Sequence, residues 1–319
     1  MGCFIRAVAS AVVAGATVPV AGAASAAEDA SGTPDVQYPA PQAGYLDSHR
    51  DLQEPKERLG GPLDITIEQD GGVVFIALPD TRELDTRVFG VPGKPRAYGG
   101  TPWINGVPPE LREKQEDGAT VTAEKTPYGD KHTTMLGESF KLQARDVTAT
   151  DAAVTQDRVE MTASWRDEDG NTYSVTCCTR MSAHGVEFPT FGGVVTNHLL
   201  HGFTRLGTPL MPTQFAHFAF WGMGEVRFNG QATGEPRLVH GMLTEYVREQ
   251  GYKLAHDDGV RPKEDLHFHL MVPPMTPRPD GTGFMRDPVI TGFERADGEM
   301  LGFWHVMFEQ LDHEARPVR

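Results

Sequence analysis

The chain has 319 residues and a formal charge of −15 at neutral pH, with 44 acidic and 29 basic side chains. Such an acidic surface repels the phosphates of nucleic acids and of anionic membranes, so neither is expected as a partner. With only three cysteines, no disulfide framework is available, and the chain is long enough to be stabilised by one large core or two.

The N-terminal segment predicts export. Arg6 is the only charged residue before Glu28, and an apolar run of small residues leads to the sequence Ala24-Ser25-Ala26. This pattern is typical of a cleaved signal peptide over residues 1–26 rather than a stable membrane anchor, because the run is weakly hydrophobic. We therefore expect a secreted or periplasmic protein with a mature charge of −16.

Residues 27–60 have no helical or strand period and are expected to form an extended or disordered tail. From Leu63 the pattern alternates. The Gly71-Gly72 pair predicts a β-hairpin, as do the turn residues near Gly170, Asn229-Gly230 and Asp297-Gly298. A short helix is expected after Pro108-Pro109.

These alternating segments, with 35 glycines and 24 prolines, predict an all-β antiparallel sandwich or barrel. A change in composition near Ser182 divides the chain into an N-terminal β lobe at 61–181 and a His- and Met-rich C-terminal lobe at 182–319. The two could be lipocalin-like lobes or parts of one large sandwich.

Cys177 and Cys178 are adjacent, and strand alternation would point their thiols to opposite faces of a sheet. A bridge between them is not expected, because a disulfide between neighbouring residues is strained. A structural role is expected for Cys177.

Nine of the twelve histidines follow residue 190, and a His-x-Met step occurs three times in strand-like segments. The alternation places His240 with Met242, His269 with Met271, and His305 with Met307, and it places His267 on the face of His269. If these strands are neighbours, the imidazoles converge. His217 lies in a fourth aromatic segment.

Converging imidazoles predict a metal site or a group of acid–base catalysts. His240, His267, His269 and His305 are the expected metal ligands: three ring nitrogens suit zinc with an open position for water, and thioether sulfur beside imidazole suits copper. His269, His305 and Glu309 are the expected catalytic groups, because imidazole and carboxylate can move protons without a metal. The alternative is that these side chains only pack and hydrogen-bond.

A catalytic function and two non-catalytic alternatives therefore stay open. The first is a His-rich pocket, with or without metal, that acts as a lyase, hydrolase or oxidase on a small or apolar substrate. The second is a non-catalytic lipocalin-like protein that binds an apolar ligand, or a copper-handling protein. The hydrolase and phosphate-binding motifs Gly-x-Ser-x-Gly, His-Glu-x-x-His and the glycine-rich loop are missing from the sequence.

Overall fold

The structure, a computed structural model, describes residues 63–96, 98, 107–147, 157–178, 182–183, 186–187, 194–204, 207–257, 266–280, 284–289 and 302–317. All of them belong to one compact unit, Tyr38–Arg319. The expected signal peptide, the tail at 27–60 and the turn at Asp297-Gly298 lie outside the described residues, so they stay predictions.

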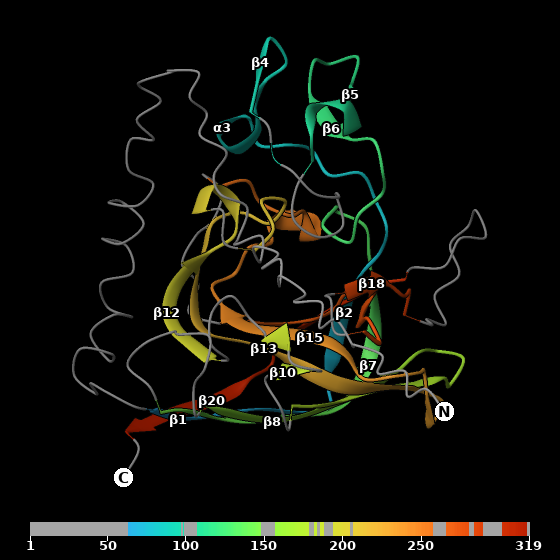
Figure 1. Cartoon of the computed structure of the whole chain (residues 1–319), viewed down its shortest axis with the longest axis vertical. Helices are drawn as coiled ribbons and strands as arrows, with labels where there is room; N and C mark the ends of the chain where they lie inside the picture. Colours follow the sequence, from blue (N-terminus) through green and yellow to red (C-terminus); the bar gives the residue numbers. More distant parts are fainter. Residues whose placement is uncertain are drawn as a thin grey trace, which may run out of the picture. The chain divides into compact units, whose positions relative to one another are not determined.

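Eight antiparallel strands form a closed barrel, which confirms the prediction of an all-β antiparallel barrel (Figure 1). Around the barrel these are β2 (Val73–Ala77), β19 (Trp304–Phe308), β16 (His267–Val272), β15 (Arg237–Thr244), β13 (Gln214–Phe228), β9 (Thr172–Cys177), β8 (Arg158–Arg166) and β7 (His132–Asp146). Pairing between β2 and β7 closes the ring. Strands from both sides of residue 182 therefore share one barrel.

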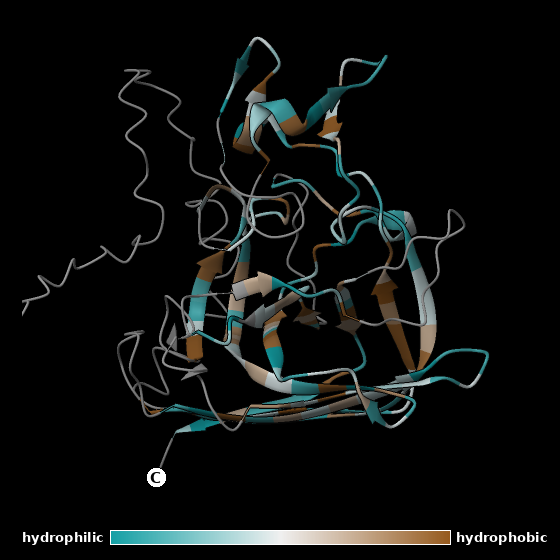
Figure 2. Cartoon of the chain, turned by 45° about the vertical axis from the view of Figure 1, so that its right-hand side comes forward, coloured by the Kyte–Doolittle hydropathy of each residue, from teal (hydrophilic) through white to brown (hydrophobic). Residues whose placement is uncertain are grey.

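Four strands extend the sheet beyond the ring. They are β1 (Leu63–Asp70), next to β7, β20 (Asp312–Pro317), next to β1, and β12 (Val194–Leu200) and β14 (Gln231–Ala232), both next to β13. The residues of β20 are all exposed and mostly polar, and Figure 2 colours the strand that leads to the C-terminus mainly in the hydrophilic shade. Charge on an edge strand discourages pairing with another chain.

The remaining elements are short. They are α3 (Thr86–Phe89), β3 (Gly90–Val91), β4 (Lys94–Pro95), η1 (Pro109–Leu111), β5 (Arg112–Lys114), β6 (Thr120–Thr122), β10 (Ser182–Ala183), β11 (Val186–Glu187), η2 (Gly202–Thr204), η3 (Gln250–Tyr252), β17 (Met275–Pro277) and β18 (Phe284–Arg286). The helix expected after Pro108-Pro109 is the single 3-10 turn η1. Most of the other short elements lie in connections between barrel strands.

The expected hairpins have two outcomes. The hairpins β8–β9 and β13–β14 form as predicted. The hairpin expected at Gly71-Gly72 was wrong, because β1 and β2 do not pair with each other: both pair with β7, one after the other. The two glycines have φ of 69° and 77° and form a break in one continuous line of pairing, rather than a reversal of the chain.

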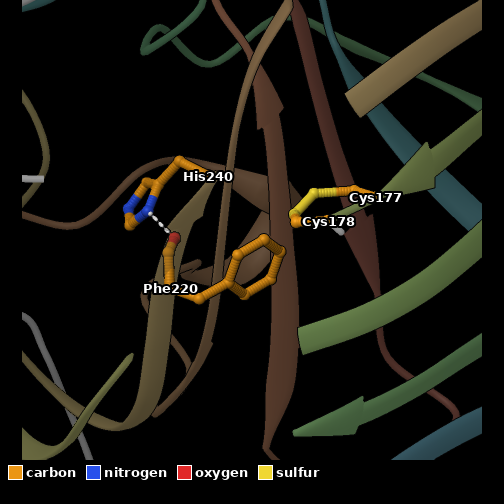
Figure 3. Close-up of a disulfide and its surroundings, with 4 residues drawn as sticks. All are labelled: Cys177, Cys178, Phe220 and His240. Carbon is orange, nitrogen blue, oxygen red and sulfur yellow. Dashed lines mark hydrogen bonds between the residues drawn. A yellow bond between two sulfur atoms is a disulfide. The ribbon is translucent and has the colours of Figure 1, made fainter. Parts of the chain in front are cut away.

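The prediction for the cysteines was also wrong, since Cys177 and Cys178 are joined by a disulfide (Figure 3). Strand β9 ends at Cys177, so strand alternation no longer sets the direction of Cys178. Both residues are buried in the core.

The interior of the barrel is filled by aromatic side chains that meet from opposite strands. The ring of Trp304 lies 5.2 Å from that of Trp165, and the ring of Phe140 lies 4.6 Å from Phe308 and 4.7 Å from Phe268. These five side chains are fully buried or within 1% of it. The alternate residues of β16 and β19 must then face outward.

Candidate functional site

Strands β15, β16 and β19 are neighbours, so the three His-x-Met steps lie side by side as expected. In the antiparallel register, Met271 of β16 pairs with His240 on one side and with His305 on the other. One row further, His269 pairs with Met242 and with Met307. Histidines and methionines therefore alternate both along and across this face of the sheet.

This face is the outer side of the barrel, and two connections cover it. Arg82, in the connection between β2 and β7, donates hydrogen bonds to the backbone carbonyls of Leu210, Leu254 and Ala255. Asp130, in the same connection, accepts one from the amide of Leu254. The connection after β15 is thus fastened to the one after β2, and both lie over the histidines.

Three of the predicted residues form a continuous chain of imidazoles. His267 Nε2 lies 2.7 Å from His269 Nε2, and His269 Nδ1 lies 2.9 Å from His305 Nε2. At the inner end, His305 Nδ1 lies 3.0 Å from the carbonyl oxygen of Pro127. All three histidines have no exposed surface. The predicted convergence of His267, His269 and His305 is therefore present, with each link at hydrogen-bonding distance.

At the outer end of the chain stands Glu309, just beyond β19. Its Oε1 lies 3.8 Å from His267 Nδ1, and its side chain is 18% exposed. The hydroxyls of Tyr252 and Tyr246 donate hydrogen bonds to its two oxygens, at 2.9 and 3.1 Å. Glu309 is thus the part-exposed member of the chain formed with His267, His269 and His305.

Burial and hydrogen bonding act against each other at Glu309. Burial raises the pKa of a carboxyl group, but the contact with His267 and the hydrogen bonds from Tyr252 and Tyr246 outweigh it and hold the pKa below its ordinary value. The carboxylate form is therefore the stable one at neutral pH.

Burial also keeps the inner imidazoles neutral. It lowers the pKa of His305 to about 3, aided by the charge of Arg248. It lowers the pKa of His269 well below the ordinary value, and the neighbouring His267 and His305 act in the same direction. Neutral imidazoles are the form that accepts a hydrogen bond at one nitrogen and donates at the other.

Arg248 places a second charge beside the network. Its Nη1 donates to the carbonyl oxygens of Gly129 and Tyr252, and its guanidinium lies 5.1 Å from the centre of the Tyr252 ring. The residue is 5% exposed. The part-exposed carboxylate of Glu309 and the buried guanidinium of Arg248 thus both contact Tyr252, with charges of opposite sign.

His240, a predicted metal ligand, lies on the same face but outside the chain. Its Nδ1 donates to the carbonyl oxygen of Phe220, at 2.7 Å, and the dashed line in Figure 3 marks this hydrogen bond. The ring stacks on Trp221 with centroids 4.4 Å apart. Its Nε2 is buried and has no hydrogen-bond partner among the described residues. Burial lowers the pKa of His240 to about 4.

His201, which is not among the predicted site residues, lies near His240, with ring centroids 6.2 Å apart. Its Nδ1 accepts the amide proton of Thr208, and its Nε2 lies 3.1 Å from Met242 Sδ. His217, by contrast, lies on β13, two strands from β16, with its ring packed against Phe215 at 5.0 Å.

The tyrosines, Arg248 and Pro127 were not found by sequence reasoning either. They lie in irregular connections, where residue spacing carries no information about direction. The only local signal was that Tyr246 closely follows the His240 strand.

The metal prediction is not tested by this arrangement. Among the described residues, no group of three or more His, Cys, Asp or Glu side chains is placed to hold a metal ion. In the chain, His269 directs a different nitrogen at each neighbour, so the three rings do not point at one common position. The assignment of His240, His267, His269 and His305 as metal ligands stays a prediction.

A second concave surface lies along β1 and β20, away from the histidines. Its lining includes the charged side chains of Asp64, Glu68, Arg145, Asp312, Glu314 and Arg316, together with His313. Arg145 and Asp64 form an exposed ion pair there at 2.7 Å. Exposed charges of both signs are typical of a solvated surface, and we assign this one no function.

Fold and site together define an antiparallel eight-stranded β-barrel protein with a buried imidazole chain on the outer side of its wall. Comparison with known proteins found no matching family model, no matching curated protein and no matching solved structure. In the part of the chain that the structure describes, no helix has the length and apolar character needed to span a membrane.

Proposed function

We propose that the protein is an acid–base enzyme, and that a small substrate binds at the outer end of the imidazole chain. The observation that carries this proposal is the contact between the part-exposed carboxylate of Glu309 and the fully buried His267. Paired groups of this kind can take a proton from one substrate atom and return it to another. Many lyase and hydrolase reactions use such a pair.

The roles follow from exposure. Glu309 is the group that meets the substrate, since it is the part-exposed member. His269 and His305, which the sequence put forward as catalytic, have no exposed surface and act through His267. The partly exposed Tyr246 and the buried Tyr252 hold the carboxylate in place through their hydroxyls.

The lipocalin-like alternative, a non-catalytic protein that encloses an apolar ligand, has less support. An apolar ligand would need room within the barrel, where the rings of Trp165, Trp304 and Phe308 already meet. This observation favours chemistry on the outer face over binding within the lumen.

The test is a screen of the mature protein against esters, lactones and compounds that can lose water or another leaving group beside a carbonyl. We expect turnover of at least one class and a fall in kcat/KM of about 100-fold or more in Glu309→Gln, the usual scale for loss of a general acid or base. Glu314→Gln, at an exposed carboxylate on β20, is the matched control and should keep full activity. Full activity of Glu309→Gln, or no turnover across the panel, would argue against the proposal.

Metal binding is a second candidate, and one observation favours it. His240 donates its Nδ1 proton to a backbone carbonyl and leaves Nε2 buried. Metal-ligating histidines are commonly fixed in this way. Zinc and copper analysis of protein purified without chelator or nickel, beside His240→Gln, tests it: metal in the wild type that is lost in the variant supports the candidate.

Export remains part of the proposal and is supported by the apolar segment that ends at Ala26. N-terminal sequencing of protein recovered from outside the cytoplasm should begin near residue 27. Recovery of the uncleaved chain in the cytoplasm would contradict it.

A further inference from the structure

The guanidinium of Arg248 is buried, with the side chain only 5% exposed, and its hydrogen bonds are unevenly distributed. Its Nη1 donates to the carbonyl oxygens of Gly129 and Tyr252, at 2.9 and 3.3 Å. Its Nε and Nη2 are buried and have no hydrogen-bond partner among the described residues. None of the ion pairs formed in the described part of the chain includes Arg248. Because burying a charge without a counter-ion is costly, an anionic acceptor here would stabilise the fold.

The other arginines that are buried in the described part of the chain have their charge or their donors satisfied. Arg82 donates from Nε, Nη1 and Nη2 to backbone carbonyl oxygens, so each nitrogen has an acceptor. Arg237 forms an ion pair with Asp287, at 2.9 Å. Within the described residues, Arg248 has neither solution, so its open donors are available to a group from outside the chain.

The two open nitrogens of Arg248 favour one kind of acceptor. Nε and Nη2 share one edge of the planar guanidinium, and their N–H groups point in the same direction. A carboxylate fits this edge because its two oxygens can accept one hydrogen bond each. A chloride ion has a single atom and a neutral amide a single acceptor oxygen, so neither matches the edge as well.

Tyr252 connects this guanidinium to the candidate site. The guanidinium lies 5.1 Å from the centre of the tyrosine ring, and the hydroxyl of the same ring donates to Glu309 Oε1 at 2.9 Å. Arg248 and Glu309 therefore contact the same side chain, one at its ring and the other at its hydroxyl. Arg248 and Gly129 lie in connections between strands, so access of a small anion requires no change in strand pairing.

We infer that the Nε and Nη2 edge of Arg248 binds the carboxylate group of a small ligand. The link to catalysis rests on the proposed function: where Glu309 transfers protons, the substrate is a small carboxylate anion held by Arg248. The carbon next to that carboxylate is then the expected place of proton transfer. Binding at Arg248 does not itself depend on turnover.

Nitrogen NMR of the full chain, labelled at arginine, tests the site in the wild type, because the Nε–H signal of Arg248 reports its hydrogen bond directly. Sodium acetate is the probe, and acetamide and sodium chloride at equal concentrations are the controls. We expect acetate to shift this signal until the site is saturated, and the two controls to leave it in place. A signal that acetate does not shift, or that chloride shifts equally, would overturn the inference.

The variant Arg248→Lys keeps the positive charge but removes the two-nitrogen edge. Acetate should therefore bind it about tenfold or more weakly, as measured by the rise of the thermal midpoint with acetate concentration. Arg145→Lys, at an exposed arginine on β7, is the matched control and should bind acetate as the wild type does. Undiminished binding by Arg248→Lys would contradict the inference. If Arg248→Lys does not fold, the wild-type titration still decides, since it needs no variant.

Glu309→Gln separates this inference from the proposed function. The variant removes a negative charge near the bound carboxylate, so acetate binding should be kept or strengthened while turnover is lost. Loss of acetate binding in Glu309→Gln would place the ligand elsewhere and overturn the inference. Acetate binding at Arg248 without turnover of any compound in the screen would contradict only the proposed enzyme, and turnover without acetate binding would contradict only the carboxylate site.

Discussion

The two faces of the β16–β19 pair solve opposite problems with alternating residues of the same strands. Toward the interior, Trp304 and Phe308 meet aromatic rings from β7 and β8 and need only the right volume. Toward the outside, His269 and His305 are just as completely buried, but each ring nitrogen needs a partner of the correct polarity. Burial on the inner face therefore stabilises by itself, whereas burial on the outer face stabilises only as long as the hydrogen-bonded chain is intact.

The largest expected effect is on the inner face. Trp304→Ala should lower the free energy of unfolding by about 3–5 kcal/mol, because it removes a ring that contacts Trp165 and Tyr173 and leaves a cavity. Denaturant unfolding measures it. Leu136→Ala, at a side chain that is 45% exposed, is the control and should change little. A loss below about 1 kcal/mol for Trp304→Ala would mean that the interior is not tightly packed.

The next expected effect is on the pH dependence of stability, and it should come from the buried histidines rather than from the aromatic side chains of the inner face. In the folded protein burial lowers the pKa of His201 and His305 to about 3 and that of His240 to about 4, from an ordinary 6.5. The unfolded chain therefore binds more protons between pH 6.5 and about 3, and stability must fall as the pH falls through this window.

At pH 5 each of these histidines should cost about 2 kcal/mol, since one pKa unit corresponds to about 1.4 kcal/mol. Asp257 offsets part of the loss, because burial raises its pKa to about 6 and its protonated form is favoured in the fold. Denaturant unfolding at pH 7 and pH 5 provides the measurement. His201→Gln should reduce the change in the free energy of unfolding between pH 7 and pH 5, while Trp304→Ala should leave that change as in the wild type. An equal change in wild type and His201→Gln would contradict the prediction.

The smallest effect is expected away from both faces. Arg145 on β7 and Asp64 on β1 form an exposed ion pair. Its geometry is good, but solvent screens the attraction between the two charges. Arg145→Gln should therefore leave the denaturation midpoint unchanged within error at physiological salt. A clear loss of stability would show that the strands outside the ring contribute more than their exposure suggests.

Regular alternation explains what the sequence could predict. A period of two places His240 with Met242, His269 with Met271 and His305 with Met307 on one face of each strand, whichever strands pair. The structure makes the three strands neighbours and brings His269 and His305 into contact. Pairing partners are different: the turn signal at Gly71-Gly72 is equally compatible with a hairpin and with two strands that follow one another along β7.

The partners of the histidines could not be predicted for a related reason. Tyr252, Arg248 and Pro127 lie in irregular connections, so their directions depend on long-range contacts such as those of Arg82 with the carbonyls of Leu254 and Ala255. Residue spacing within a strand can be recognised from a short stretch of sequence. The polar partners of the buried imidazole chain depend instead on contacts between residues far apart in the sequence.

The pairing of β1 with β20 has a practical consequence. Leu63, the first residue of β1, lies opposite Pro317, the last residue of β20, so the two ends of the described fold are adjacent. A short linker from 317 to 63 could join them, and the chain could be reopened at the exposed Asn229-Gly230 turn. Circular permutation would then place the new ends beside β14, and every strand pair of the barrel ring would keep its register.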